Sequence, residues 1–318
     1  LAGSQGAGHL HAPAGRGEEG QDPGEEGDEE GFQERNRIVG KRIRGGVAGS
    51  FPASKSPRPR RGISFPETPM SNKVYLVVLS GGQDSTTCLA EALDAHPEDP
   101  VCAITIDYGQ RHAAELQAAR RVRALAEARF ARTIPHYQIP ARGMLIGSSP
   151  LVNRDAKVDT YDSAAVLPGG LEKTFVPLRN TFFLTIAANH AVAIAMSQGA
   201  KEAVIITGVS QEDYGGYPDC RESFLSALTE AFQQSLDDPE LPRVTIQAPL
   251  LHLNKAQTVL HSLTLPHCLE MLSWSHTCYN GSVPPCGHCH ACLLRAKGFA
   301  EAGIADPLVA RLSRASED

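Results

Sequence analysis

Long apolar runs, an excess of positive charge and an opening signal segment are all missing from this 318-residue sequence. The longest apolar stretch, residues 182–196, includes Asn189 and His190, so it is too short and too polar to cross a bilayer and indicates a buried helix. No charged segment followed by an apolar one opens the sequence, so secretion is not expected. With 30 Lys and Arg against 36 Asp and Glu, the net charge of −6 disfavours a generally basic nucleic-acid binder.

The first 69 residues have almost no periodic apolar pattern. They hold 14 of the 29 glycines and seven of the 22 prolines, and an acidic run at residues 18–34 precedes a basic run at residues 35–61. Because such a segment buries too little apolar surface to offset the entropy of ordering it, we expect residues 1–69 to be disordered. The basic run could be an arm for nucleic acid or an acidic surface, but we expect a dispensable extension, with Met70 as the working start of the protein.

Apolar runs of strand length alternate with helical patterns from residue 70 onward. Strands are predicted at residues 74–79, 101–106, 133–139, 203–207 and 244–248. Helices are predicted at residues 85–93, 113–130, 180–198, 222–236 and 254–263. This alternation indicates an α/β fold with a parallel sheet covered on both faces, in which ligands bind beyond the carboxyl ends of the strands. We therefore expect the site in the loops that follow Leu79, Ile106 and Thr207.

A glycine loop, SGGQDS at residues 80–85, follows the first strand. Its glycines allow close approach of the backbone to an anion, and Ser85 and Thr86 lie where a helix begins and where its dipole favours a phosphate. The loop has neither the Walker A nor the GxGxxG pattern, and an ordinary glycine turn capped by Ser85 is the alternative. The string resembles the SGGxDS loop of the PP-loop ATP pyrophosphatases. That resemblance implies cleavage of ATP to AMP and pyrophosphate with magnesium, for which Asp84 is a candidate ligand.

Four of the eight cysteines crowd together near the C-terminus, as Cys278, Cys286, Cys289 and Cys292. Their spacing suits tetrahedral zinc, and four thiolates leave no open position for a catalytic water, so we expect a structural zinc site. Disulfides are the alternative, disfavoured because the sequence looks intracellular. Two histidines inside the cluster, His288 and His290, could replace one cysteine but are expected to be bystanders.

Three further loops carry polar residues toward the expected site. They are DYGQRH at residues 107–112, VPLRN at 176–180 and DYGGYPDCR at 213–221. Arg179 begins a helix, where a cation gains nothing from the dipole, so its position suggests an anionic ligand. Tyrosines, an aspartate and an arginine fork could together recognise a planar heterocycle that bears a carboxylate, although each loop taken singly is also typical of an ordinary turn.

A specific resemblance follows from six strings taken in order: SGGQDSTTCL, DYGQRH, VPLRNTFFL, GYPDCR, TCYNG and CGHCHACLLRAKGF. Over about residues 73–299 they resemble the 7-cyano-7-deazaguanine synthase family. The resemblance implies a Rossmann-like PP-loop domain of the adenine nucleotide alpha hydrolase type at residues 70–263 and a helical zinc-binding region at 264–318. The 69-residue extension and the short gap between Cys278 and Cys286 depart from the family pattern.

The resemblance also implies roles for individual residues. The ATP loop carries over to Leu79, Ser80, Gly81, Gly82, Gln83, Asp84, Ser85, Thr86, Thr87, Cys88 and Leu89, and the zinc ligands carry over to the four clustered cysteines. The candidate catalytic residues are Asp84, Arg179, Arg221 and Lys255. The candidate substrate contacts are Tyr108, Gln110, Arg111, Asn180, Tyr217 and Asp219.

The implied reaction turns 7-carboxy-7-deazaguanine into its 7-cyano counterpart. A carboxylate resists ammonia because oxide is a poor leaving group. Adenylation by ATP supplies AMP as the leaving group and gives the amide, and a second adenylation gives the nitrile. No segment resembles a glutaminase, so ammonia is expected as the nitrogen donor. We expect a cytoplasmic enzyme with small-molecule substrates and with neither a membrane nor a nucleic-acid partner, and the family resemblance suggests a homodimer.

Two other functions stay open at this point. A PP-loop tRNA sulfurtransferase would need a cysteine that carries a persulfide, for which Cys220 is the candidate, but residues 70–318 carry the whole −6 charge, which disfavours tRNA. A zinc-ribbon regulator that binds nucleic acid would use the basic run at residues 35–61. The acidic charge of residues 70–318 and the SGGQDS loop weigh against that second function.

Overall fold

The structure is a computed structural model that describes residues 71–111, 113–167, 172–211 and 217–315. The chain divides into two compact units, Leu1–Ser64 and Phe65–Asp318, and all the described residues belong to the second unit. The segment predicted to be disordered, residues 1–69, lies outside the described residues, as do residues 213–216 of the third polar loop.

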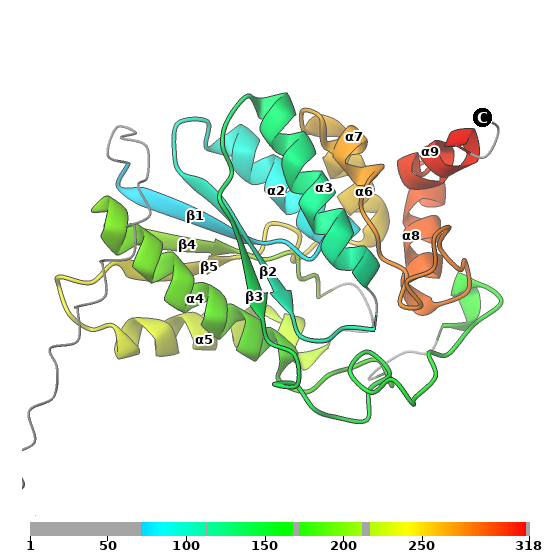
Figure 1. Ribbon diagram of the computed structural model, residues 1–318, viewed down its shortest axis with the longest axis horizontal. Helices are drawn as coiled ribbons and strands as arrows, with labels where there is room; N and C mark the ends of the chain where they lie inside the picture. The colour runs from blue at the N-terminus through cyan, green and yellow to red at the C-terminus, as the bar shows by residue number, and fades with distance from the viewer. Residues whose placement is uncertain (1–70, 112, 168–171, 212–216, 316–318) are drawn as a thin grey trace, which may run out of the picture. The chain divides into compact units, whose positions relative to one another are not determined.

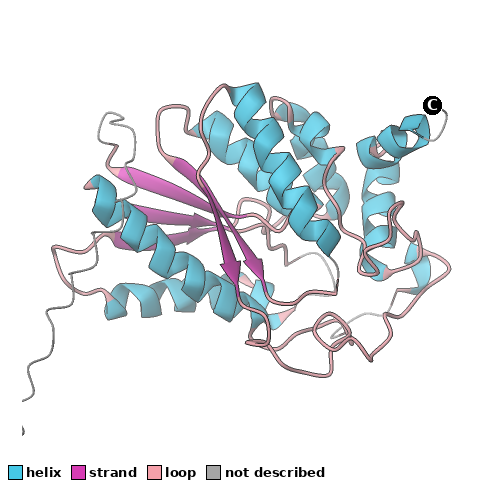
Figure 2. Cartoon of the chain, in the orientation of Figure 1, coloured by secondary structure: helices cyan, strands magenta, loops and turns pink. Residues whose placement is uncertain are grey.

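Five parallel strands form the centre of the second unit (Figure 2). They are β1 (Lys73–Val78), β2 (Val101–Asp107), β3 (His136–Pro140), β4 (Glu202–Ile206) and β5 (Arg243–Gln247). Their order across the sheet is β3-β2-β1-β4-β5, and each adjacent pair is parallel. The chain first adds strands on one side of β1 and then continues with β4 on its other side. The topological switch, beyond which ligands bind in such sheets, therefore lies between β1 and β4.

Helices cover both faces of the sheet (Figure 1). One face carries α2 (Gln83–Ala95), α3 (Ala113–Phe130), α6 (Lys255–Thr264) and α7 (Cys268–Leu272). The other carries α4 (Arg179–Gln198) and α5 (Glu222–Ser235). The cysteine segment leads into α8 (His290–Glu301) and α9 (Pro307–Ala315), and short 3-10 helices span Ala164–Val166 and Pro218–Cys220. Within the described ranges, none of these helices combines the length and the apolar character needed to cross a bilayer.

Side chains of β1 alternate between two hydrophobic cores. Tyr75 and Val77 pack with α2, α3, α6 and α7, whereas Val74 and Leu76 pack with α4 and α5. All four side chains are at most 4% exposed. Because both faces of the sheet are buried, the strand is an unbroken apolar run and not a polar–apolar alternation.

The predicted α/β fold with a parallel sheet is confirmed. The predicted strands and helices are all present, with ends that differ by at most three residues. The largest difference is at β3, which begins at His136 and not at Thr133. Pro135 lies between these positions, and proline has no N–H to give to a strand ladder.

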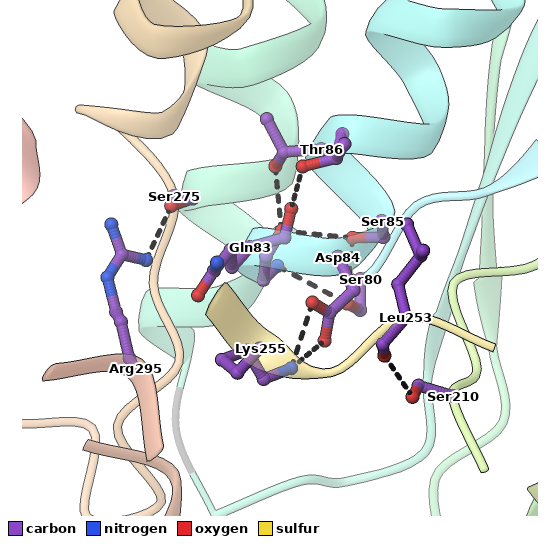
Figure 3. A network of polar contacts seen from close by, with 12 residues as sticks. Ser80, Gln83, Asp84, Ser85, Thr86, Ser210, Leu253, Lys255, Ser275 and Arg295 are labelled. Carbon is purple, nitrogen blue, oxygen red and sulfur yellow. Dashed lines mark hydrogen bonds and ion pairs between the residues drawn. The ribbon is translucent and has the colours of Figure 1, made fainter. Parts of the chain in front are cut away.

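Arg295 of α8 joins the three C-terminal helices. Its guanidinium is buried and donates to both carboxylate oxygens of Asp306, at 2.6 and 2.8 Å. It also donates to Ser275 Oγ at 2.8 Å, drawn in Figure 3, and to the Leu272 carbonyl at 3.2 Å. The end of α7, the middle of α8 and the start of α9 therefore share one buried cation.

Two arginine side chains lie over the ring of Trp274. The guanidinium carbon of Arg121 on α3 is 5.0 Å from the centre of the ring, and that of Arg311 on α9 is 4.0 Å from it. Arg311 also donates to the Ser273 carbonyl at 2.8 Å. Cations over an indole ring are attracted by its negative face, so these contacts hold α9 close to α3.

Replacing Arg295 tests its part in stability. We expect Arg295→Ala to lower the free energy of unfolding by about 3 kcal/mol, because it leaves the Asp306 carboxylate buried without its cation. Urea unfolding followed by circular dichroism measures the loss. The control is Arg314→Ala on α9, an exposed arginine. Equal stability of the two variants would show that the buried cation contributes nothing.

Candidate active site

The carboxyl ends of β1, β2 and β4 surround a cavity of about 260 Å³. Leu79, Ile106 and Thr207, at the starts of the three loops chosen from the sequence, all line it. The cavity therefore lies at the switch point between β1 and β4. The predicted site residues that form its wall are Leu79, Ser80, Gly82, Gln83, Asp84, Ser85, Tyr108, Gln110, Arg111, Arg179, Asn180 and Tyr217.

The other predicted site residues do not line the cavity: Gly81, Thr86, Thr87, Cys88, Leu89, Asp219, Arg221 and Lys255. Cys88 and Leu89 belong to the hydrophobic core between α2 and the sheet. Arg221 is exposed at the N-cap of α5. Lys255 and Asp219 contact wall residues, as described below.

The SGGQDS loop is held in a conformation that glycine alone permits. Gly81 has a φ of +89°, and a Cβ there would lie 2.5 Å from the Glu115 carbonyl oxygen and 2.6 Å from the Ala119 nitrogen. Ser80 Oγ and Ser85 Oγ are 3.0 Å apart across the loop (Figure 3). The loop is thus packed against α3, and a hydrogen bond between its two serine hydroxyls spans it.

The first turn of α2 faces the cavity without a side-chain cap. Gly82 is the N-cap residue and offers no side-chain oxygen to the free amides of the turn. A Cβ at Gly208, after β4, would lie 2.9 Å from the Ser85 nitrogen, so the two loops are in close contact. Uncapped amides at a helix N-terminus attract anions, and this turn is suited to a phosphate group.

Lys255, the first residue of α6, forms an ion pair with Asp84. Its Nζ lies 3.0 Å from each carboxylate oxygen (Figure 3). The side chain is nearly buried, and Asn254 caps α6 through a capping box. A Cβ at Gly298 of α8 would lie 2.6 Å from Lys255 Cγ, so α8 closes over the lysine stem. The sequence assigned both residues to the site but gave no reason to pair them.

Tyr108, Glu115 and Arg179 line the cavity and influence one another electrostatically. Burial raises the pKa of Tyr108 to about 12, although the Arg179 guanidinium, which hydrogen-bonds the phenol, opposes the rise. Burial also raises the pKa of Glu115 to about 7. Burial lowers the pKa of Arg179, but Tyr108, Tyr279 and Asp219 together outweigh it and raise that pKa overall.

Asn180 lines the cavity near Cys220 and contacts Asp219, which is not part of the wall. The Asn180 amide donates to the Asp219 carbonyl at 3.1 Å and to Cys220 Sγ at 3.4 Å, and its backbone N–H donates to Asp219 Oδ2 at 3.4 Å. Burial raises the pKa of Asp219, and Arg179 opposes that rise. Tyr217 is buried beside them, with its hydroxyl 3.4 Å from Thr174 Oγ1.

Arg111 uses its guanidinium to hold a neighbouring loop. It donates to the carbonyls of Pro150, Arg154 and Ala156 at 3.3, 3.3 and 2.5 Å. Gln110 accepts from the Tyr108 backbone N–H at 3.1 Å. Both side chains line the cavity, and both also shape its wall.

The four clustered cysteines converge on one point. Their sulfur atoms all lie within 4.8 Å of one another. Sulfurs bound to one tetrahedral zinc are roughly 3.8 Å apart, from a Zn–S distance of about 2.3 Å. Backbone N–H groups of Tyr279, Cys286 and Cys289 point at these sulfurs from 3.4 to 3.5 Å, an arrangement that stabilises thiolates. The cysteines therefore fit a single metal ion.

Sequence reasoning missed three contributors to the site. Glu115 lies in the first turn of α3, where an acidic residue is already explained by the helix dipole and so gives no signal. Phe183 lines the cavity with its ring centre 5.2 Å from that of Tyr108. The His276 backbone N–H donates to the Gly81 carbonyl at 2.8 Å, so the cysteine segment supports the SGGQDS loop.

Comparison with known proteins gives consistent results. Relatives named 7-cyano-7-deazaguanine synthase come from Chromobacterium violaceum, at 49% identity over 76% of this chain and 95% of theirs, and from Laribacter hongkongensis, at 48% identity over 75% and 95%. A third, from Gloeobacter violaceus, is 44% identical over 74% and 95%. One solved structure, a U34-tRNA thiolase NcsA from Methanococcus maripaludis with its 4Fe–4S cluster, matches at 15% identity over 76% of this chain and 67% of its own. Its TM-score of 0.33 is too low to support an argument.

The family assignment rests on a model that covers most of the described sequence. The model of the queuosine biosynthesis protein QueC matches residues 74–303, which include the SGGQDS loop, the cavity and all four clustered cysteines. Relatives near half identity over nearly their whole length agree with this match. This chain belongs to the QueC family of queuosine biosynthesis proteins.

Proposed function

We propose that this chain is an ATP-dependent ligase that converts 7-carboxy-7-deazaguanine and ammonia into 7-cyano-7-deazaguanine for queuosine biosynthesis. The name of its relatives supports the product. One observation carries the chemistry: the SGGQDS loop opens on the same cavity as Arg179, Asn180 and Tyr217. A phosphate-binding turn and a polar, aromatic wall in one cavity allow a nucleotide and a heterocyclic carboxylate to meet.

The phosphate end of the cavity would hold ATP. The uncapped amides of the first α2 turn would bind the departing pyrophosphate, and Lys255 and Arg179 would balance charge on the phosphates. Asp84 is our proposed anchor for magnesium or one of its waters, beside its ion pair with Lys255. Arg221, exposed at the start of α5, would contact the phosphates or the substrate carboxylate from the edge of the cavity.

The other end of the cavity would bind the heterocyclic substrate. Asn180, held by its hydrogen bonds to Asp219, would offer a donor and an acceptor to the edge of a planar ring, and Tyr108 and Tyr217 would offer ring faces. Gln110 and Arg111 would support this wall, Arg111 by holding the loop at residues 150–156. Each role is part of the proposal.

The chemistry would proceed through two activations. A carboxylate oxygen attacks the α-phosphorus, pyrophosphate leaves, and the acyl adenylate forms. Ammonia attacks the carbonyl carbon, AMP leaves and the amide remains. The amide oxygen then attacks a second ATP, and loss of AMP with two N–H protons leaves the nitrile. Catalysis here is mainly positioning and charge balance in one cavity.

The remaining cofactor and partner proposals follow from the same site. Cys278, Cys286, Cys289 and Cys292 would hold one zinc ion, which would brace the segment that supports the SGGQDS loop. The substrates are small molecules, and we propose no nucleic-acid or membrane partner and a homodimeric assembly. A reducing cytoplasm would keep these thiolates available for metal.

An endpoint assay tests the reaction. The purified protein is incubated with 7-carboxy-7-deazaguanine, ATP, magnesium and ammonium, and mass spectrometry and nucleotide chromatography follow the products. We expect the nitrile with AMP and pyrophosphate. Formation of AMP without the nitrile would indicate a different acceptor substrate. Transfer RNA would be tested next, because Cys220 lies in the cavity. If folded, metal-loaded protein forms neither the nitrile nor AMP, the proposal is overturned.

Metal analysis tests the cysteine site. We expect about one zinc and no iron per chain by elemental mass spectrometry. Cys289→Ser should lower both metal content and the unfolding midpoint, because it removes one of four ligands. His288→Ala is the matched control, since this exposed residue lies inside the cluster without belonging to it. Iron with visible absorption would point to an iron–sulfur cluster and contradict the zinc assignment.

A further inference from the structure

Two carboxylates line the cavity among the described residues, Asp84 and Glu115. Asp84 is already balanced by Lys255, with both oxygens at 3.0 Å from Nζ. Glu115 has no such partner: across residues 71–111, 113–167, 172–211 and 217–315, no lysine, arginine or histidine forms an ion pair with it. The cavity thus holds one carboxylate that the roles given above do not use.

Glu115 is placed beside the phosphate-binding loop by its own backbone. Its carbonyl oxygen is the atom that a Cβ at Gly81 would meet at 2.5 Å, so the first turn of α3 touches the loop directly. The side chain of the same residue lines the cavity. Glu115 therefore combines contact with the proposed phosphate-binding loop and a place in the cavity wall.

The surroundings of Glu115 suit a group that exchanges a proton near neutral pH. Burial raises its pKa to about 7, the Arg179 guanidinium lowers it, and the charge of Cys278 raises it further. Tyr108 also lines the cavity and stays neutral, because burial raises the pKa of the phenol to about 12. General bases work best when their pKa lies near the working pH.

The reaction proposed above needs such a group. Ammonia is the nucleophile, but the nitrogen donor is mostly ammonium at neutral pH and carries no free electron pair. We propose that Glu115 binds the incoming ammonium and takes one proton from it as the C–N bond forms. This inference rests on the proposed ligase function and deepens it, since it assigns the nitrogen donor to a place in the cavity.

The proton and electron balance of the step is simple. The Glu115 carboxylate accepts a proton from ammonium and becomes a carboxylic acid, which frees the nitrogen electron pair. That pair forms the C–N bond to the acyl adenylate, the C–O bond to AMP breaks, and AMP leaves with that bond's electrons. The nitrogen then loses a second proton to solvent, leaving the amide. No oxidant, reductant or further reactant is needed.

Asp219 is less suited to this role. It lies behind Asn180, whose backbone N–H donates to Asp219 Oδ2, and it is not part of the cavity wall. Asp84 is already paired with Lys255 and is our proposed anchor for magnesium, so it is not available to ammonium. Glu115 therefore remains the cavity carboxylate that forms no ion pair within the described part of the chain.

Stability as a function of pH tests the state of Glu115. Its folded pKa of about 7 lies above the ordinary value of 4.5, so the folded protein binds this proton more tightly than the unfolded chain does. The contribution to stability is therefore complete below pH 4.5 and is lost as the pH rises toward 7. Urea unfolding at several pH values should show wild type losing stability over this range relative to Glu115→Gln. A constant difference between the two would contradict the raised pKa.

Separate assays of the half-reactions test the catalytic proposal. Adenylation alone is followed by exchange of labelled pyrophosphate into ATP, which needs 7-carboxy-7-deazaguanine but no ammonium. We expect Glu115→Gln to keep this exchange near the wild-type rate and to lower ammonium-dependent amide formation about 100-fold or more. Hydroxylamine, which is already unprotonated at neutral pH, should restore much of the lost rate in the variant.

The control is Glu222→Gln, an exposed glutamate in the first turn of α5, which should leave both rates unchanged. A Glu115→Gln variant that loses exchange along with amide formation would show that Glu115 holds the heterocycle or ATP, and would overturn the proposal. A variant with both rates intact would overturn it as well. Absence of exchange in the wild type would instead reject the ligase function itself, so the two failures are distinguishable.

Discussion

The ion pair between Asp84 and Lys255 is the contact on which the rest of the site depends. Asp84 belongs to the first turn of α2, whose amides have no side-chain cap, while Lys255 begins α6 and packs against Gly298 of α8. One contact therefore fixes the glycine loop against both the helical layer and the C-terminal helices. A nearly buried lysine needs this carboxylate, because a buried cation without a partner is strongly destabilising.

The cysteine segment belongs to the cavity as well as to the metal site. His276, Thr277 and Tyr279 line the cavity, and Cys278 lies between them. The backbone of the same segment donates to the carbonyl of Gly81. An ion bound by the four cysteines would thus hold a wall of the cavity in place although it takes no part in bond making.

The fold could be predicted from the sequence because its signals are local. Buried parallel strands are continuous apolar runs, and the SGGQDS string marks both a tight turn and the start of α2. The pairing of Lys255 with Asp84 joins residues 171 positions apart, which no local pattern encodes. Glu115 escaped notice because an acid in a first helical turn looks like ordinary capping, and only the folded structure shows that it lines the cavity. Cys88 and Leu89, included with the ATP loop, instead pack in the core beneath it.

The arginine pair around Trp274 has a practical consequence. The chain has a single tryptophan, and it lies where α3, α7 and α9 meet, with two guanidinium groups over its ring. Its fluorescence therefore originates from one place and depends on whether α9 remains docked. The molecule carries its own optical reporter of the C-terminal helix, which allows undocking to be followed without any attached dye.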